Sequence, residues 1–117
     1  MANTSVDSNK ELPKKRMAAG ALFFNHHEEA LIVKPTYRDY RLIPGGVIEH
    51  NESPYEACVR EVREEIGTTP SIKSLLCIDY RSAHDGNSES MQFVFDGGML
   101  SDGMISQIHL DSREIET

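Results

Sequence analysis

Long apolar runs are missing from this sequence of 117 residues. None approaches the roughly 20 residues that a membrane-spanning helix needs, and the N-terminal stretch lacks the apolar core of a secretory signal. The composition, 38% apolar and 26% charged, is that of an ordinary globular domain in water. We therefore expect one cytoplasmic domain that does not engage a membrane.

Cysteine is scarce, because Cys58 and Cys77 are the only two in the chain. They lie far apart without metal-binding spacing, and each has apolar neighbours in the sequence. This pattern favours two free, buried thiols in a reducing compartment. A disulfide between them is the less favoured alternative.

Basic residues are also in the minority, with 12 lysines and arginines against 19 acidic residues and a net charge of -7. An acidic chain repels phosphate backbones, so the composition argues against nucleic-acid binding. The small basic cluster at 14–16 ends a polar segment, 1–16, which we expect to be a flexible solubilising tail. The folded domain is expected to occupy the remaining residues, 17–117.

Short apolar stretches, rich in β-branched residues and separated by turn-rich links, predict a sheet. The stretches 17–24 and 29–34 flank the turn-like sequence "NHHE" and favour a β-hairpin. Further strands are expected at 42–46, 72–81, 91–98 and 104–110, with a chain end that returns to polar loop. With one helix between 54 and 66, the layout predicts a mixed α+β domain with about five or six strands in its sheet.

The expected helix has clear start and stop signals. Ser53 is a favourable N-cap, Pro54 suits the first helical position, and Glu56 completes a capping box. Gly67 is the natural residue to end the helix in the left-handed conformation. Local sequence alone therefore predicts a helix over 54–66.

At about 100° per residue, the side chains of this helix fall into three sectors. One sector has mixed charge and faces water. Another is apolar, is expected to face the core, and consists of Cys58, Val62, Tyr55, Ile66 and Val59. The third borders the apolar sector and is acidic, with Glu61, Glu64 and Glu65 and no lysine among them.

The acidic sector has two interpretations that its geometry does not separate. Hard divalent cations prefer oxygen ligands, so three carboxylates on one side of a helix suit a metal site. Solvated helix surfaces are also rich in glutamate. The preceding Gly45 and Gly46 favour the metal site, because a backbone without side chains can aim a carbonyl at a cation or admit a ligand. Glu52, just before the cap, is positioned to hold this loop through Arg60.

These residues resemble the signature of the Nudix hydrolases, a MutT-like family. That signature is G-x5-E-x7-R-E-U-x-E-E-x-G-U, where U is a bulky aliphatic residue. The chain matches every fixed position but the last, where Thr68 stands, with Gly46, Glu52, Arg60, Glu61, Val62, Glu64, Glu65 and Gly67. The resemblance extends more loosely over residues 17–116.

The resemblance implies a Nudix-type α/β/α sandwich around a mixed sheet, and Mg²⁺-dependent hydrolysis of a pyrophosphate bond in a nucleoside diphosphate linked to another moiety. Mn²⁺ replaces magnesium in some members. By this resemblance, the metal ligands are the carboxylates of Glu61, Glu64 and Glu65 and the backbone carbonyl of Gly45. Glu61 or Glu64 would be the catalytic base. Gly46, Glu52, Arg60 and Gly67 would be structural.

The chain departs from the family pattern at its end, because the family's C-terminal strand and helix have no expected counterpart before Thr117. We interpret Glu114 and Glu116 as a polar chain end rather than as a later-loop carboxylate. The missing elements keep an alternative function open, that of a non-catalytic module that binds a nucleotide metabolite. The resemblance also allows a homodimer. Candidate substrate contacts are Arg38, Tyr40, Arg41 and Arg81.

Overall fold

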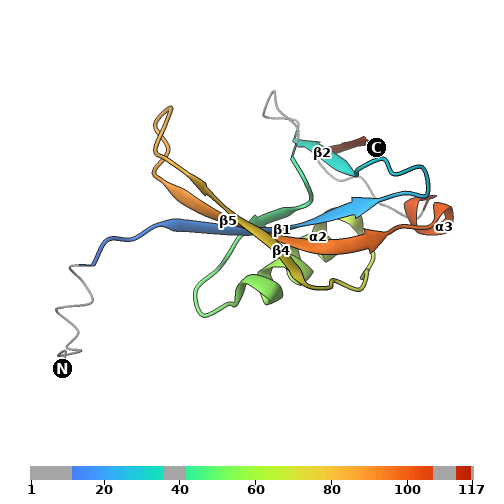
Figure 1. The fold of residues 1–117 in the computed structure, drawn as a ribbon, viewed down its shortest axis with the longest axis horizontal. Helices are drawn as coiled ribbons and strands as arrows, with labels where there is room; N and C mark the ends of the chain where they lie inside the picture. Colours follow the sequence, from blue (N-terminus) through green and yellow to red (C-terminus); the bar gives the residue numbers. More distant parts are fainter. Residues whose placement is uncertain (1–11, 36–41, 107–112, 117) are drawn as a thin grey trace.

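The computed structural model describes residues 12–35, 42–106 and 113–116, and in this part of the chain it confirms a mixed α+β fold. Figure 1 shows the arrangement. The strands are β1 (Arg16–Phe24), β2 (Ile32–Pro35), β3 (Gly45–Val47), β4 (Leu75–Arg81), β5 (Ser90–Met99) and β6 (Arg113–Glu116). The helices are α2 (Pro54–Ile66) and α3 (Asp102–Ser106).

The main sheet has four strands in the order β3-β1-β5-β4. β1 runs antiparallel to β3 and parallel to β5, while β4 and β5 form an antiparallel pair. β1 is therefore central and joins the strand before the helix to the strands after it. β2 leaves this sheet and pairs with β6 in a separate two-stranded sheet.

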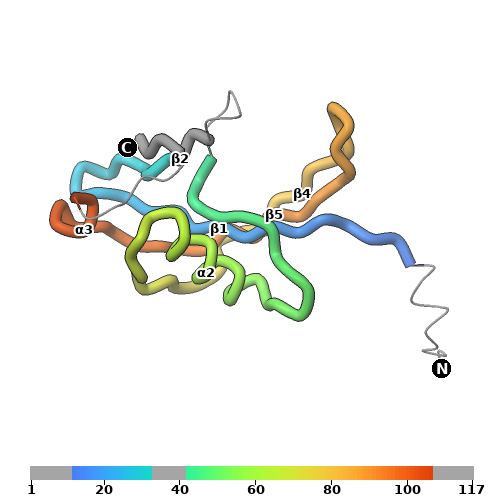
Figure 2. Tube along the Cα trace, turned by 180° about the vertical axis from the view of Figure 1, so that it is seen from behind, coloured from blue at the N-terminus to red at the C-terminus, as the bar shows by residue number. Residues whose placement is uncertain are grey.

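α2 covers one face of the main sheet, against β1 and β3 (Figure 2). The predicted capping is confirmed, since Ser53 and Glu56 form a reciprocal capping box and Gly67 ends the helix with φ 75°. The residues that form the core between helix and sheet are Ala19, Ala21, Phe23, Leu31, Ala57, Cys58, Val62, Ile66, Ile72, Phe95 and Leu100. The prediction that the apolar sector of the helix faces the core is wrong for one residue, because Tyr55 is 46% exposed. It reaches the edge of the core, where its hydroxyl donates to the Ile72 carbonyl.

The expected β-hairpin of 17–24 with 29–34 is wrong beyond its turn. A tight turn does form, in which the Asn25 side chain accepts hydrogen bonds from the His27 and Glu29 amides. Only the isolated bridge between Phe24 and Ala30 follows it. β3 pairs with Ala18–Gly20 on the same side of β1 as this bridge and β5 occupies the other side, so the chain diverges and β2 pairs with β6. The expected single sheet is consequently two sheets.

The strand expected at 104–110 is wrong over its described part, because α3 covers Asp102–Ser106. The Ser101 hydroxyl accepts a hydrogen bond from the Met104 amide, a local N-cap that starts a helical turn. The chain end is also not a loop in its described part, since β6 pairs with β2 over four residues. Both differences depend on capping and long-range pairing rather than on apolar periodicity.

The link between β4 and β5 turns tightly, as the sequence predicts. The adjacent Asp85 and Gly86 have φ values of 48° and 80°, the left-handed pair expected of a type I′ turn. The prediction that both cysteines are buried is wrong for Cys77, which is exposed on β4, whereas Cys58 is buried and both are free. β4 lies at the sheet edge beyond the reach of α2, so its apolar sequence has nothing to pack against among the described residues.

Two further predictions concern the N-terminal tail and membrane-spanning helices. Most of the tail expected over 1–16 lies outside the described residues, and β1 begins at Arg16. No helix in the described part of the chain is long and apolar enough to cross a membrane.

Candidate active site

The candidate site begins where β3 meets the middle of α2. A Cβ on Gly46 would lie 2.4 Å from the carboxyl carbon of Glu61, which is far inside any tolerated contact. The Glu61 carboxylate therefore rests on bare backbone, and a side chain at position 46 would displace it. The loop and the helix are fitted to each other at this point.

Gly45 binds another carboxylate of the helix, that of Glu65. Its amide donates a hydrogen bond of 2.9 Å to Oε1 of Glu65, which is only 6% exposed. A Cβ at Gly45 would lie 2.3 Å from the Ala19 carbonyl oxygen on β1, so close backbone approach also requires glycine here. Glu65 thus ties the helix to β3 from inside the fold.

Arg60 links the acidic residues around it. It contacts Glu52 through two hydrogen bonds, Nε to Oε2 at 2.7 Å and Nη2 to Oε1 at 2.9 Å. Its Nη1 donates to Glu61 at 2.9 Å and to Glu64 at 3.4 Å, and Nη2 also donates to the Val47 carbonyl. One guanidinium therefore neutralises part of the acidic sector and holds the loop that precedes the helix.

This contact changes the acidity of both partners. The Arg60 hydrogen bonds lower the pKa of Glu52 from 4.5 to about 2, with help from the Glu49 amide. The same hydrogen bonds raise the pKa of Arg60 above its usual range. Glu52 is hence a carboxylate anion at any pH in which the protein would work.

The carboxylates fit a divalent cation by their chemistry, because hard cations prefer oxygen donors. Among the described residues, no three acidic, histidine or cysteine side chains already converge on one point. Glu61 faces Arg60 and Glu65 faces Gly45, whereas the side chain of Glu64 is 60% exposed. A shared cation would require Glu61 and Glu64 to turn from Arg60 toward it.

Of the four predicted substrate contacts, Arg81 alone lies within the described residues. Arg38, Tyr40 and Arg41 lie outside the described residues. Arg81 lies on β4, at the opposite edge of the sheet from β3, and its side chain pairs with Asp79 at 3.4 Å. The structure therefore does not bring Arg81 to the carboxylates.

One participant in this site was missed by sequence reasoning. Gly20 on β1 lies beneath the loop, and a Cβ there would come within 2.6 Å of the Pro44 carbonyl oxygen. That carbonyl accepts a hydrogen bond from the Ala21 amide and so anchors the start of β3. A glycine inside a strand is a recognised sign of close backbone approach and could have revealed it.

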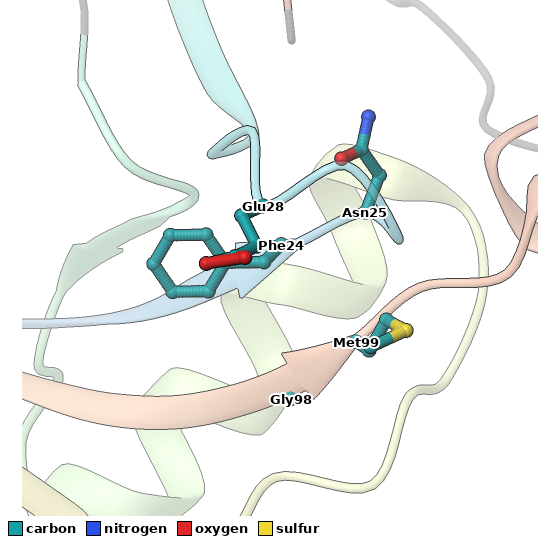
Figure 3. A pocket seen from close by; sticks show the side chains of 5 residues that line it. All are labelled: Phe24, Asn25, Glu28, Gly98 and Met99. Carbon is teal, nitrogen blue, oxygen red and sulfur yellow. The ribbon is translucent and has the colours of Figure 1, made fainter.

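A hollow of about 350 Å³ lies away from these carboxylates, at the ends of β1 and β5 (Figure 3). Phe24 and Glu28 come from β1 and the following turn, while Met99 lies across from them on β5. The Asn25 amide is already engaged within the turn. None of the signature carboxylates lines this hollow.

Fold and site together define a class of α+β domain in which a capped helix presents carboxylates against a glycine-bearing strand. Within this class the family is clear, because the NUDIX domain model matches residues 14–117. The chain belongs to the NUDIX domain family, and the resemblance noted in the sequence is confirmed.

Two curated relatives each match part of the chain. An ADP-ribose pyrophosphatase of Methanocaldococcus jannaschii is 42% identical over 65 residues, which are 52% of this chain and 38% of that protein. Human diphosphoinositol polyphosphate phosphohydrolase 2 is 39% identical over 77 residues, which are 65% of this chain and 43% of that protein. The match thus spans less than half the length of either relative.

Solved structures share the fold. A MutT protein from Methanosarcina mazei Go1 superposes with a TM-score of 0.74 at 24% identity, covering 91% of this chain and 78% of the other. A UDP-X diphosphatase superposes with a TM-score of 0.73 at 19% identity, covering 98% of this chain and 59% of the other. At these identities, the likeness establishes the architecture alone.

Proposed function

We propose that this chain hydrolyses a pyrophosphate bond in a nucleoside diphosphate linked to another moiety, with Mg²⁺ as cofactor and Mn²⁺ as a substitute. The observation that carries the proposal is the fit of Glu61 onto Gly46, which presents one signature carboxylate beside Glu64 and Glu65. Membership of the NUDIX family supports it, as do relatives named as a pyrophosphatase and a phosphohydrolase.

In this proposal Glu61, Glu64 and Glu65 hold the cation, together with the Gly45 carbonyl. The bound cation would polarise phosphoryl oxygens and make a water molecule more acidic. Glu61 or Glu64 then accepts the proton of the attacking water, which requires a carboxylate within hydrogen-bonding reach.

The remaining signature residues would act through position. Arg60 holds Glu52 and thereby the loop, Gly46 leaves space for Glu61, and Gly67 ends the helix. Their removal would displace the carboxylates without touching the substrate.

The substrate class is supported by the relatives, whose names refer to ADP-ribose, diphosphoinositol polyphosphate and UDP-linked compounds. All are small phosphorylated molecules, and the net charge of -7 argues against a nucleic-acid substrate. Arg38, Tyr40 and Arg41 stay predicted substrate contacts, and Arg81 would be one only if the substrate reached from the carboxylates to the opposite edge of the sheet. We place the domain at residues 17–117, with β1 starting one residue earlier at Arg16, and in the cytoplasm, where two free thiols are stable.

The test is a panel of ADP-ribose, nucleotide sugars, dinucleotides and nucleoside triphosphates, incubated with the chain and Mg²⁺. We expect phosphate-containing products from at least one member, and their absence with folded, metal-loaded protein would contradict the proposal. The Glu61→Gln and Glu64→Gln variants should each lose turnover, whereas Glu49→Gln, at a variable position of the signature, should keep it.

Separate measurements distinguish metal binding from proton transfer. Thermal stabilisation by Mg²⁺ reports binding to the folded chain independently of turnover. A glutamate that only holds the cation loses both stabilisation and activity when changed to glutamine. The base should lose activity while retaining most of the Mg²⁺ stabilisation.

A second function is favoured by the present arrangement of the carboxylates, which Arg60 and the Gly45 amide already engage. In that case the chain binds a nucleotide metabolite without cleaving it. Stable binding of an intact diphosphate ligand, unchanged in Glu64→Gln, would favour this function over hydrolysis.

A further inference from the structure

β4 is an edge strand with little protection. Among the described residues it pairs only with β5, and all seven of its residues are exposed. Its side chains include Ile78 and Tyr80, which are 48% and 52% exposed. Figure 1 shows that the β4–β5 hairpin extends beyond the part of the sheet that α2 covers. Exposed apolar edge strands are sites where a further strand can add.

The directions of the backbone amides and carbonyls of β5 indicate which backbone groups of β4 point to the open edge. The Arg16 amide on β1 donates to the Glu89 carbonyl, so the peptide groups of Glu89 face β1. Successive residues of a strand alternate in direction, so Gln92 faces β4 instead. The hydrogen bond from the Asp96 amide to the Ser74 carbonyl agrees with this alternation.

The register then transfers this alternation to β4. Asp79 is opposite Gln92 and therefore directs its amide and carbonyl toward β5. Its neighbours Ile78 and Tyr80 direct theirs to the open edge. The open edge consequently offers two amides and two carbonyls at the most apolar part of the strand.

The strand is also held in place before any partner arrives. The Tyr80 hydroxyl donates to Glu89, whose other carboxylate oxygen accepts from Lys15 at 2.6 Å. These contacts join β4 to the start of β1 across β5. Because the edge is already ordered, pairing would not have to order it.

We propose that β4 pairs antiparallel with β4 of a second copy of this chain, centred on Tyr80, to form a continuous eight-stranded sheet. Centring on Tyr80 pairs two open-edge residues and places Asp79 of each copy opposite Arg81 of the other. Opposite charges that face each other across strands attract. Centring on Asp79 would instead bring two carboxylates face to face, which like-charge repulsion disfavours.

Charge reversal tests this register. In Asp79→Arg, each copy would place two arginines opposite two arginines, and in Arg81→Asp two aspartates would face two aspartates. Each variant alone should therefore dimerise at least about tenfold more weakly than the unchanged chain. A mixture of the two variants should form a heterodimer, because arginines then face aspartates at both positions.

The measurement is the sedimentation of the full chain over a range of concentrations, without added metal so that the result is independent of the proposed hydrolysis. Circular dichroism and melting temperatures check that each variant folds. Heterodimers from the mixture support the proposal. A chain that stays monomeric at every concentration, or variants that dimerise as well as the unchanged chain, would overturn it.

Hydrogen exchange supplies a second test at the backbone. The Ile78 and Tyr80 amides should exchange rapidly in dilute solution and slowly in concentrated solution. Protection of these amides that does not depend on concentration would show that a segment of the same chain covers the edge, and the proposal would fail.

Discussion

At the scale of the residue, Arg60 determines how the acidic sector is organised. Its guanidinium contacts Glu52 with two hydrogen bonds and reaches Glu61 and Glu64 with its remaining donors. Lysine has a single charged nitrogen and cannot reproduce this planar set of contacts. Arg60 is therefore a positioning residue for both the loop and the helix.

The pairing of Arg60 with Glu52 predicts a pH dependence of stability. Because the folded pKa of Glu52 is depressed from 4.5 to about 2, its stabilising effect is complete above about pH 4.5 and is lost as the pH falls toward about 2. Glu52→Gln should be less stable at neutral pH, and the difference from the unchanged chain should shrink over that acidic window. Urea unfolding at several pH values measures it, and a constant difference would contradict the prediction.

A second prediction at this scale concerns Gly46. In Gly46→Ala the new methyl group would meet the Glu61 carboxylate at 2.4 Å, so that side chain must move. If Glu61 takes part in hydrolysis, a displacement of about 1 Å can lower kcat/KM about 100-fold. Gly103→Ala is the matched control, since its Cβ would meet only the Ser101 hydroxyl at 3.9 Å. Equal activities of the two variants would refute the proposed fit.

At the scale of the element, α2 is the most locally determined part of the molecule. Its capping box, N-terminal proline and C-terminal glycine all lie within the fifteen residues from Ser53 to Gly67. Removal of the cap should therefore destabilise the helix without altering the sheet.

We expect Ser53→Ala to lower the free energy of unfolding by about 1 kcal/mol, because the Glu56 amide loses its acceptor. Ser71→Ala, at an exposed position outside any helix or strand, should have little effect. Denaturant unfolding of both variants measures the difference. Equal stabilities would show that the cap contributes nothing.

Other elements could not be derived locally. The apolar pattern at 104–110 suggested a strand, but the Ser101 cap initiates α3 instead. The apolar neighbours of Cys77 suggested a buried thiol, although the position of β4 at the sheet edge leaves Cys77, Leu75 and Ile78 exposed. Strand order determines such exposure, and strand order is not encoded in the periodicity of one segment.

At the scale of the whole molecule, the two cysteines report on different regions. Cys58 is completely buried between α2 and the sheet, and burial raises the pKa of its thiol to about 12. Cys77 lies exposed on β4. Thiol reagents need access to the sulfur and react with its thiolate, so the exposed Cys77 should react faster than the buried Cys58.

A chromogenic disulfide reagent should therefore modify one thiol per folded chain and two in denaturant. Cys77→Ser should remove the rapid reaction, and Cys58→Ser should leave it unchanged. Slow labelling of Cys58 then reports unfolding of the core. Rapid modification of both thiols in the folded protein would contradict the assigned burial.

The sequence determined the capped helix, its carboxylates and the family, because caps and a spaced motif depend on residues that are near one another along the chain. Tertiary structure decided which strands pair, since β1 lies between β3 and β5 while β2 pairs with β6. It also decided that Arg60 engages Glu61 and Glu64 and that β4 is left at the edge. Contacts between distant segments depend on the packing of the whole chain, and no local pattern encodes them.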